Sequence, residues 1–305
     1  MNNNVQQDSL PNQEEMIEII KKTIQTSWQC DLTYDDIIRW LSNFTGEVFD
    51  LNEERSIALW MLCNFTYYNK KEVNHLCKLL YKYLIHDLAS KECDNDALNL
   101  TDLLDHTYFS ALGEAGESGG LLLYFFRQEA NLSIDRFYYP SRIPIGKENI
   151  AVFIDDVTLS GGTATRFFHN YLKMKKDKYK KIYYLTLFAT KKAIEKIKDI
   201  EISVLCCNML DERDKCFSEN SIMFLNYPLI REKAKQMAKH YGEKLETKKY
   251  ALGYKDSQLC FGFNYNIPNN TLPIFWSSNN WYPLFMRKEK IQNVKCRNDE
   301  FERYI

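Results

Sequence analysis

The chain has 305 residues, of which 45% are hydrophobic and 27% are charged, and its formal net charge at pH 7 is −1. This length can bury a sizeable core, and the balanced charge provides no overall attraction to nucleic acid or to an anionic membrane. No apolar run reaches the length of a membrane span, and the N-terminal residues lack the pattern of a secretory signal. The nine cysteines contain no CxxC pair, so we expect a cytoplasmic protein with reduced thiols and no zinc site.

Residues 13–100 have the pattern of a helical region. The polar residues 1–12 before them contain too few apolar side chains to fold, so we expect a disordered tail. One apolar stripe at four-residue spacing, typical of an amphipathic helix, is formed by Met16, Ile20, Ile24 and Trp28. Thr33 followed by an acidic turn predicts a helix start, and further helices are expected at residues 57–65 and after Asn69. We expect this region to be a scaffold or a docking layer for a partner protein.

Residues 101–225 alternate between strand and helix patterns. Strands are expected at residues 108–112, 136–139, 151–154, 182–189 and 202–210. Helices are expected between them, at residues 121–130, 164–173 and 190–199. Such alternation predicts an α/β fold in which helices flank a parallel sheet, and ligands of such sheets bind at the carboxyl ends of the strands. The basic run at 175–181 is typical of a solvated turn, or of a local contact with an anionic partner.

The sequence DDVTLSGGT, residues 155–163, follows the apolar strand at 151–154 and precedes a helix. A small-residue loop between a strand and a helix directs backbone N–H groups and the positive helix end at a phosphate. Glycines allow the backbone to approach the anion, and serine and threonine hydroxyls add donors. Asp155 and Asp156, one loop length away, suit hydroxyl groups or a cation. The alternative is a strand that ends in a plain aspartate turn.

This stretch resembles the phosphoribosyl diphosphate (PRPP) loop of type I phosphoribosyltransferases, in which an apolar strand is followed by two acids, hydroxyl residues and glycines. The resemblance implies a phosphoribosyltransferase-like α/β core. It also implies that Asp155 and Asp156 are the catalytic acids that hold the ribose hydroxyls, with Mg²⁺ bound on the diphosphate rather than by dedicated protein ligands. The residues that it assigns to the 5′-phosphate are Thr158, Ser160, Gly161, Gly162 and Thr163.

A second glycine-rich loop, GEAGESGG at residues 113–120, follows the first expected strand. In the resembled family a diphosphate-facing loop precedes the PRPP strand, and by this order the diphosphate contacts are Gly116, Glu117, Ser118 and Gly119. The loop also matches the GxSxG elbow of serine hydrolases, with Ser118 as the nucleophile and His169 or His240 as the base. That elbow follows its strand directly, whereas residues 113–115 intervene here, so we favour the diphosphate assignment.

The connector PSRIPIGKEN before the PRPP strand, residues 140–149, has only ten residues. Catalytic members of the resembled family insert a long mobile lid at this point, which closes over the reacting sugar. A connector of this length cannot shield much, although Arg142 and Lys147 remain candidate diphosphate contacts. This departure favours a second hypothesis, a sensor that keeps the nucleotide site without catalysis.

Residues 226–305 are expected to form a closing segment. A helix is predicted at 228–244, and the aromatic-rich stretch after it should contain a turn at 269–271 and a short strand at 272–276. Two interpretations stay open for its aromatic residues: a packed layer over the core, or a pocket wall on which a base stacks. The segments PNNTLP and WYPLFMR also resemble segments of phosphoribosyltransferase-like proteins encoded in bacterial conflict and anti-phage systems. This resemblance extends from residue 105 onward.

Together these features predict a protein that binds PRPP or a nucleotide with Mg²⁺. Its expected activity is glycosyl transfer, or hydrolysis of a nucleotide or N-glycosidic bond, as an effector of bacterial anti-phage defence. The alternative is a non-catalytic sensor or regulatory subunit of a defence complex, which acts on a partner protein through residues 13–100. Neither hypothesis includes a membrane or direct contact with nucleic acid.

Overall fold

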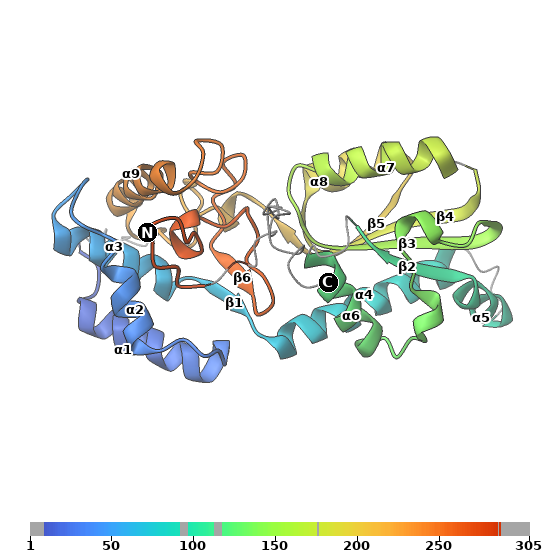
Figure 1. Cartoon of the computed structure of the whole chain (residues 1–305), viewed down its shortest axis with the longest axis horizontal. Coiled ribbons are helices and arrows are strands. Elements are labelled where there is room, and N and C mark those ends of the chain that lie inside the picture. Colours follow the sequence, from blue (N-terminus) through green and yellow to red (C-terminus); the bar gives the residue numbers. More distant parts are fainter. Residues whose placement is uncertain (1–8, 92–96, 113–117, 176, 286, 288–305) are drawn as a thin grey trace, which may run out of the picture.

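The structure, a computed structural model, describes residues 9–91, 97–112, 118–175, 177–285 and 287. These residues form two lobes that lie side by side (Figure 1). We call residues 70–210 the sheet lobe, and residues 9–69 together with 211–285 the helical lobe. The chain therefore enters the sheet lobe once and leaves it once.

The sheet lobe contains four parallel strands in the order β2-β3-β4-β5. They are β2 (Thr107–Ala111), β3 (Gly146–Thr158), β4 (Tyr179–Thr190) and β5 (Ser203–Leu210). The register places Ile154 of β3 beside Ala111 and Leu185. Side chains of β3 alternate between two apolar clusters, as the two-residue period of a strand requires. The parallel α/β fold expected from the sequence is confirmed.

Helices cover both faces of this sheet (Figure 1). One face carries α4 (Lys70–Lys91), α5 (Ala97–Asp105) and α6 (Ser118–Glu129), and the other carries α7 (Gly162–Lys175) and α8 (Lys191–Lys198). The helices α7 and α8 each connect successive strands, because parallel neighbours need a crossover connection. Thr190 caps α8 by accepting the N–H of Ala193 at 3.1 Å, so β4 turns directly into this helix at the carboxyl end of the sheet.

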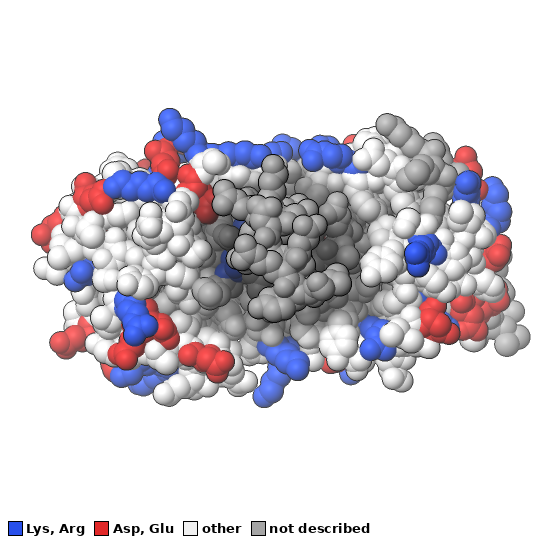
Figure 2. All heavy atoms as spheres, viewed as in Figure 1, with Lys and Arg blue, Asp and Glu red and all other residues white. Residues whose placement is uncertain are grey.

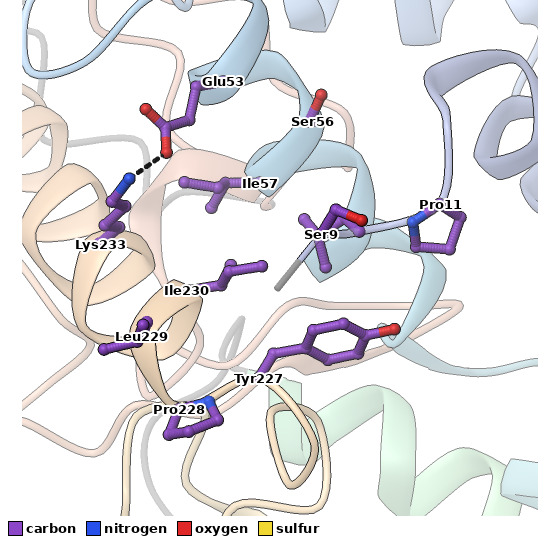
Figure 3. Close-up of a pocket in the computed structure, with 11 residues that line it drawn as sticks. Ser9, Pro11, Glu53, Ser56, Ile57, Tyr227, Pro228, Leu229, Ile230 and Lys233 are labelled. Atoms are coloured by element: carbon purple, nitrogen blue, oxygen red, sulfur yellow. Dashed lines mark hydrogen bonds and ion pairs between the residues drawn. The ribbon is translucent and has the colours of Figure 1, made fainter. Parts of the chain in front are cut away.

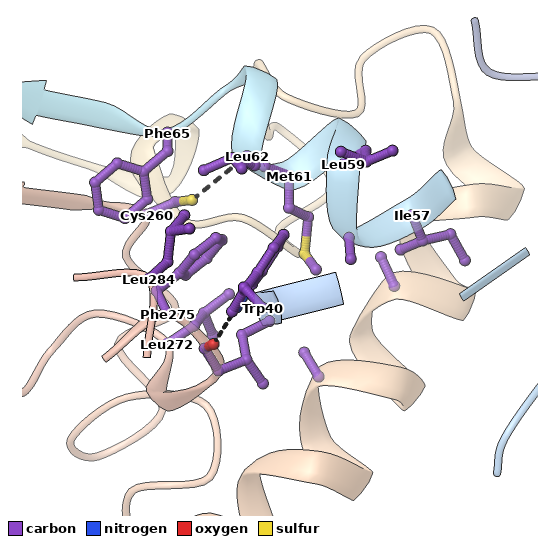
Figure 4. Packing of buried hydrophobic residues seen from close by; sticks show 14 of the residues in the cluster. Trp40, Ile57, Leu59, Met61, Leu62, Phe65, Cys260, Leu272, Phe275 and Leu284 are labelled. Carbon is purple, nitrogen blue, oxygen red and sulfur yellow. Dashed lines mark hydrogen bonds between the residues drawn. The ribbon is translucent and has the colours of Figure 1, made fainter. Parts of the chain in front are cut away.

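The helical lobe joins the first helices to the C-terminal segment. Its helices are α1 (Gln13–Thr23), which continues as a π-helical turn at Ile24–Trp28, α2 (Tyr34–Leu41), α3 (Leu51–Cys63) and α9 (Pro228–Leu245). Thr33 caps α2 in a capping box with Asp36, as the sequence predicts. The Trp40 ring stacks on Phe275 at 5.6 Å, and its Nε1 donates to the Ile274 carbonyl at 2.7 Å (Figure 4). Here the aromatic segment forms a packed layer.

Aromatic contacts hold the two lobes against each other. Strand β1 (Thr66–Tyr68) pairs in parallel with β6 (Phe261–Phe263) in a small second sheet. Tyr68, Phe261 and Phe263 pack against Phe188 of β4, with ring centroids 5.0, 5.2 and 5.8 Å away respectively. The expected helical region is thus shared between the lobes, since α1 to α3 pack on the C-terminal segment and α4 packs on the sheet.

Two short strands expected from the sequence are not strands in the described structure. Arg136 ends one 3-10 turn and Pro140 begins another, and of the residues between them only Phe137 bridges β2. That prediction is wrong because Pro140 has no N–H with which to extend the ladder. Residues 272–276 contain the 3-10 turn Pro273–Phe275 instead, because a proline at the first position of a helical turn presets its backbone angle.

None of the helices within the described residues combines the length and the apolarity that a bilayer crossing requires. Every cysteine in the same part of the chain carries a free thiol, as the absence of a disulfide pattern predicts. Across these residues the fold is held by packing, hydrogen bonds and ion pairs rather than by disulfide bonds.

Candidate functional site

The carboxyl ends of β3, β4 and β5 face the helical lobe across a cavity of about 590 Å³. Its lining residues fall in the stretches 155–163, 190–192, 210–215, 254–259 and 269–270. Ligands of parallel α/β sheets bind at this edge, because the loops after the strands carry the polar groups. All five predicted phosphate contacts line the cavity: Thr158, Ser160, Gly161, Gly162 and Thr163. The structure therefore brings the predicted PRPP loop together with segments of the second lobe.

Asp155 and Asp156 are near the end of β3, and the two-residue period of the strand directs them to opposite faces of the sheet. Asp155 lines the cavity, and its Oδ2 accepts a hydrogen bond from the Tyr184 hydroxyl at 2.8 Å. Asp156 is 7% exposed, and its Oδ1 accepts the Val157 N–H at 2.8 Å. Of the two acids, only Asp155 is part of the cavity wall.

The acid pair is electrostatically perturbed. Burial and the neighbouring charge of Asp156 raise the pKa of Asp155 to about 8. The Tyr184 hydroxyl opposes this shift by donating to the carboxylate, while its own pKa is raised well above the ordinary value by burial and by Asp155. The surroundings of Asp155 therefore favour its protonated form. A hydroxyl donor or a cation in the cavity would favour the ionised form.

The loop at 158–163 lies at the N-terminus of α7, as the sequence predicts. Gly161 has a φ of +64°, and a methyl group added there would lie 3.1 Å from the Ala193 carbonyl oxygen of α8. Glycine accommodates both this backbone conformation and this close contact without strain. Thr190 donates to the Leu159 carbonyl at 2.5 Å and ties the loop to the start of α8. The first N–H groups of α7 are thereby held in place for an anion.

The second glycine-rich loop falls partly outside the described residues, since Gly116 and Glu117 are not among them. Ser118 and Gly119 begin α6. A methyl group added to Gly119 would lie 3.2 Å from the Leu112 carbonyl oxygen, so this glycine lets α6 start close against the end of β2. The assignment of the loop to diphosphate stays a prediction.

The residues named for a serine hydrolase are not brought together. His169 is exposed on α7, whereas α6, which begins at Ser118, covers the opposite face of the sheet (Figure 1). His240 lies in the helical lobe, where its Nε2 is 2.9 Å from Oε2 of Glu47. A nucleophile and its base must be within hydrogen-bonding reach, so this arrangement gives no support to hydrolase chemistry at Ser118.

The connector at 140–149 supplies no cover for the cavity. Lys147 lies at the amino end of β3, and Arg142 precedes it in a short 3-10 turn. Asp155 lies at the other end of the same strand. The two basic residues named as candidate diphosphate contacts are therefore far from the cavity, and segments of the helical lobe bound it instead.

Basic residues around the cavity are the site feature that sequence reasoning missed. Lys191 and Lys192 begin α8 directly after β4, and Lys215 and Lys255 approach from the helical lobe. Figure 2 shows basic side chains along the upper edge of the molecule, over α8 and the loops of the helical lobe. The rule that ligands bind at strand ends could have identified the first two lysines. The two from the helical lobe carry no such local signal.

A second cavity of about 460 Å³ lies within the helical lobe, between α3 and the start of α9 (Figure 3). Ile57, Tyr227 and Ile230 contribute to its mainly apolar walls. Glu53 and Lys233 form an ion pair beside it. Its lining includes neither an acid pair nor a glycine loop, so the cavity at the strand ends is the better candidate for a phosphate-bearing ligand.

The described residues include no cluster of three or more histidine, cysteine or carboxylate side chains suited to a metal. Asp155 nonetheless offers the cavity a carboxylate, the type of ligand that Mg²⁺ prefers. Mg²⁺ in nucleotide sites is commonly held by one or two carboxylates and the phosphates of the substrate. This donor set fits a metal that enters with a diphosphate.

The parallel sheet, with an acid pair and a glycine loop at the end of β3, has the features of a phosphoribosyltransferase-like protein. The family model PRTase-CE, in which PRTase denotes phosphoribosyltransferase, matches residues 37–287. The match includes both lobes and most of the chain, and the chain therefore belongs to the PRTase-CE family. The resemblance drawn from the loop at 155–163 is thereby confirmed. No curated protein sequence matches the chain.

Three solved structures show a limited similarity to this chain. Orotate phosphoribosyltransferase from Aeropyrum pernix is 15% identical with a TM-score of 0.27, over 42% of this chain and 70% of that one. A hypothetical protein from Neisseria gonorrhoeae with bound ppGpp is 9% identical with a TM-score of 0.33, over 48% and 84%. The AQ2163 protein from Aquifex aeolicus is 13% identical with a TM-score of 0.30, over 66% and 98%. At these TM-scores the similarities carry no functional argument.

Proposed function

We propose that the chain binds PRPP or a nucleotide with Mg²⁺ in the cavity between the lobes, and that it acts in glycosyl transfer or in hydrolysis of a nucleotide or N-glycosidic bond. The observation that carries the proposal is the glycine loop at the N-terminus of α7, with Asp155 on the same cavity wall. Membership of the PRTase-CE family supports the same class of ligand. A role as an effector in bacterial anti-phage defence is part of the proposal, and it rests on the resemblance of the aromatic C-terminal segment.

In this proposal the loop N–H groups and the hydroxyls of Ser160 and Thr163 hold the 5′-phosphate. Asp155 accepts a ribose hydroxyl, and Tyr184 orients its carboxyl group through the 2.8 Å hydrogen bond. The reaction breaks the bond between C1′ and the departing diphosphate or base and forms a bond from C1′ to the acceptor or to a water oxygen, and positive charge develops on the sugar between these events. Fixed carboxylate charge near the ring stabilises that charge electrostatically. Bound Mg²⁺ supplies neutralisation of the diphosphate charge.

A non-catalytic sensor or regulatory subunit is the second candidate. The short connector supports it, because residues 140–149 lead into the amino end of β3 and leave the cavity at the other end uncovered by a lid of the expected kind. A sensor would keep the ligand site and signal its occupancy to a partner protein bound to the helical lobe.

Isothermal titration calorimetry with PRPP and Mg²⁺ tests the ligand site that both candidates share. Replacing Asp155 and Asp156 together by Asn keeps the shape but removes charged acceptors, so we expect affinity to fall by roughly tenfold to a hundredfold. Asp199→Asn, which changes an exposed carboxylate of the sheet lobe, should leave binding unchanged. Equal PRPP affinity in the wild type and the double variant would exclude the site.

Release of diphosphate or free base distinguishes the enzyme from the sensor. The protein is incubated with Mg²⁺, PRPP and a mixture of bases, or with nucleotides, and the products are separated by chromatography. Turnover that is lost in Asp156→Asn supports the enzyme. Saturable binding without turnover, with partner proteins present, supports the sensor.

A further inference from the structure

A loop of the helical lobe, residues 249–258, reaches across the cavity to the glycine loop. A methyl group built on Gly162 would lie 4.0 Å from the Nζ atom of Lys255. Gly162 is the first residue of α7, where the helix N-terminus favours an anion. Tyr254 belongs to the same loop and also lines the cavity. A cation from one lobe therefore lies beside the phosphate loop of the other.

The backbone around Lys255 is held in an uncommon conformation. Lys255 and Asp256 have φ angles of +56° and +60°, which residues other than glycine rarely adopt. Their N–H groups donate to the carbonyls of Lys249 and Gly253 at 3.1 and 3.0 Å. This backbone conformation costs free energy by itself, so it persists only where other contacts hold it. Here the two hydrogen bonds hold the loop in its path toward the cavity.

The charge of Lys255 has no acidic side chain at ion-pair distance in the part of the chain that the structure describes. Lys215, which lines the same cavity, differs because it pairs with Glu212 at 2.7 Å. The Nζ of Lys255 lies 5.3 Å from the centre of the Tyr254 ring, which supports the side chain without neutralising its charge. A phosphate on the glycine loop would supply the counter-charge.

We propose that Lys255 contacts the 5′-phosphate of a ligand held by residues 160–163, and that the loop at 249–258 takes over the covering role for which the connector at 140–149 is too short. The inference rests on the proposed function and adds that the ligand is bound by both lobes. Its consequence is that occupancy of the cavity restrains the position of the helical lobe relative to the sheet.

Calorimetric titration of Lys255→Met with PRPP and with ribose 5-phosphate tests this contact. Both ligands carry the 5′-phosphate, so both affinities should fall by roughly tenfold to a hundredfold, and Lys255→Arg should retain most of the binding. The loss should shrink at high salt, because screening weakens the charge contact. Lys248→Met removes the same charge from an exposed neighbour and should bind like the wild type. Loss of PRPP affinity alone would place Lys255 on the diphosphate and overturn the inference.

The double Asn variant at Asp155 and Asp156 separates this inference from the proposed function. If the wild type binds neither ligand, both ideas fail. If the wild type binds, the double variant loses binding and Lys255→Met binds like the wild type, then only the role of Lys255 is refuted. Thermal unfolding of ligand-free Lys255→Met should match the wild type, since the side chain is exposed, and this excludes loss of binding through misfolding.

Discussion

Replacing Asp155 by Asn should make the stability of the protein less dependent on pH. In the folded protein, burial and the charge of Asp156 raise the pKa of Asp155 from the ordinary value of 3.8 to about 8. A carboxyl group with a raised pKa binds its proton more tightly in the folded state than in the unfolded state. Its contribution to stability is therefore complete below the unfolded pKa and is lost as pH rises through the folded pKa, a window from about pH 4 to about pH 8.

The structure bounds the size of this effect. A tenfold change in a proton-binding constant corresponds to about 1.4 kcal/mol, so the full shift would amount to roughly 6 kcal/mol. Asp155 borders the open cavity and keeps some contact with solvent, so screening should reduce the observed change to about 2 to 3 kcal/mol. The wild type should lose this much stability relative to Asp155→Asn between about pH 4 and about pH 8.

Urea unfolding at constant ionic strength across this pH range measures the effect, since other titrating groups are common to both proteins. Two further variants test the cause. Tyr184→Phe removes a hydrogen bond that favours the ionised carboxyl, so it should raise the folded pKa further and extend the loss of stability to higher pH. Asp156→Asn removes a charge that raises the pKa of Asp155, so this variant should lose less stability as the pH rises. Parallel pH profiles for the wild type and Asp155→Asn would refute the reasoning.

Two stability predictions follow from other contacts. Gly161→Ala should destabilise by about 2 kcal/mol, because Gly161 has a positive φ and its backbone packs closely on α8. A methyl group added to Gly120 of α6 would meet open space. In thermal unfolding, Gly120→Ala should therefore be neutral or stabilising, in contrast to Gly161→Ala. Glu54 is fully buried and accepts the Tyr241 hydroxyl at 2.7 Å and three backbone N–H groups, so Glu54→Gln should cost about 2 to 4 kcal/mol in denaturant unfolding. Glu53→Gln disrupts only a partly exposed ion pair, and a loss above about 1 kcal/mol would contradict this contrast.

Contiguous sequence signals were sufficient to locate the glycine loop at the start of α7. A strand, a glycine loop and a helix start follow one another at 151–163, and an anion site of this kind needs only neighbouring backbone N–H groups. Thr33 was identified as a helix cap for the same reason, since its hydrogen bonds reach only three residues along the chain. Residues 136–139 had an aromatic composition typical of a strand, but pairing depends on a partner edge and on Pro140, which the local pattern underweighted.

The amino-acid sequence by itself determined the parallel α/β core and the glycine loop that precedes α7, because periodicity and turn chemistry are local properties. Only the tertiary structure decided that Asp155 borders the cavity while Asp156 is buried, and that Tyr184 donates to the first of them. Only the tertiary structure placed Lys255 beside Gly162. Those contacts join residues far apart in the chain, and they arise from the packing of the helical lobe against the strand ends, which no local spacing encodes.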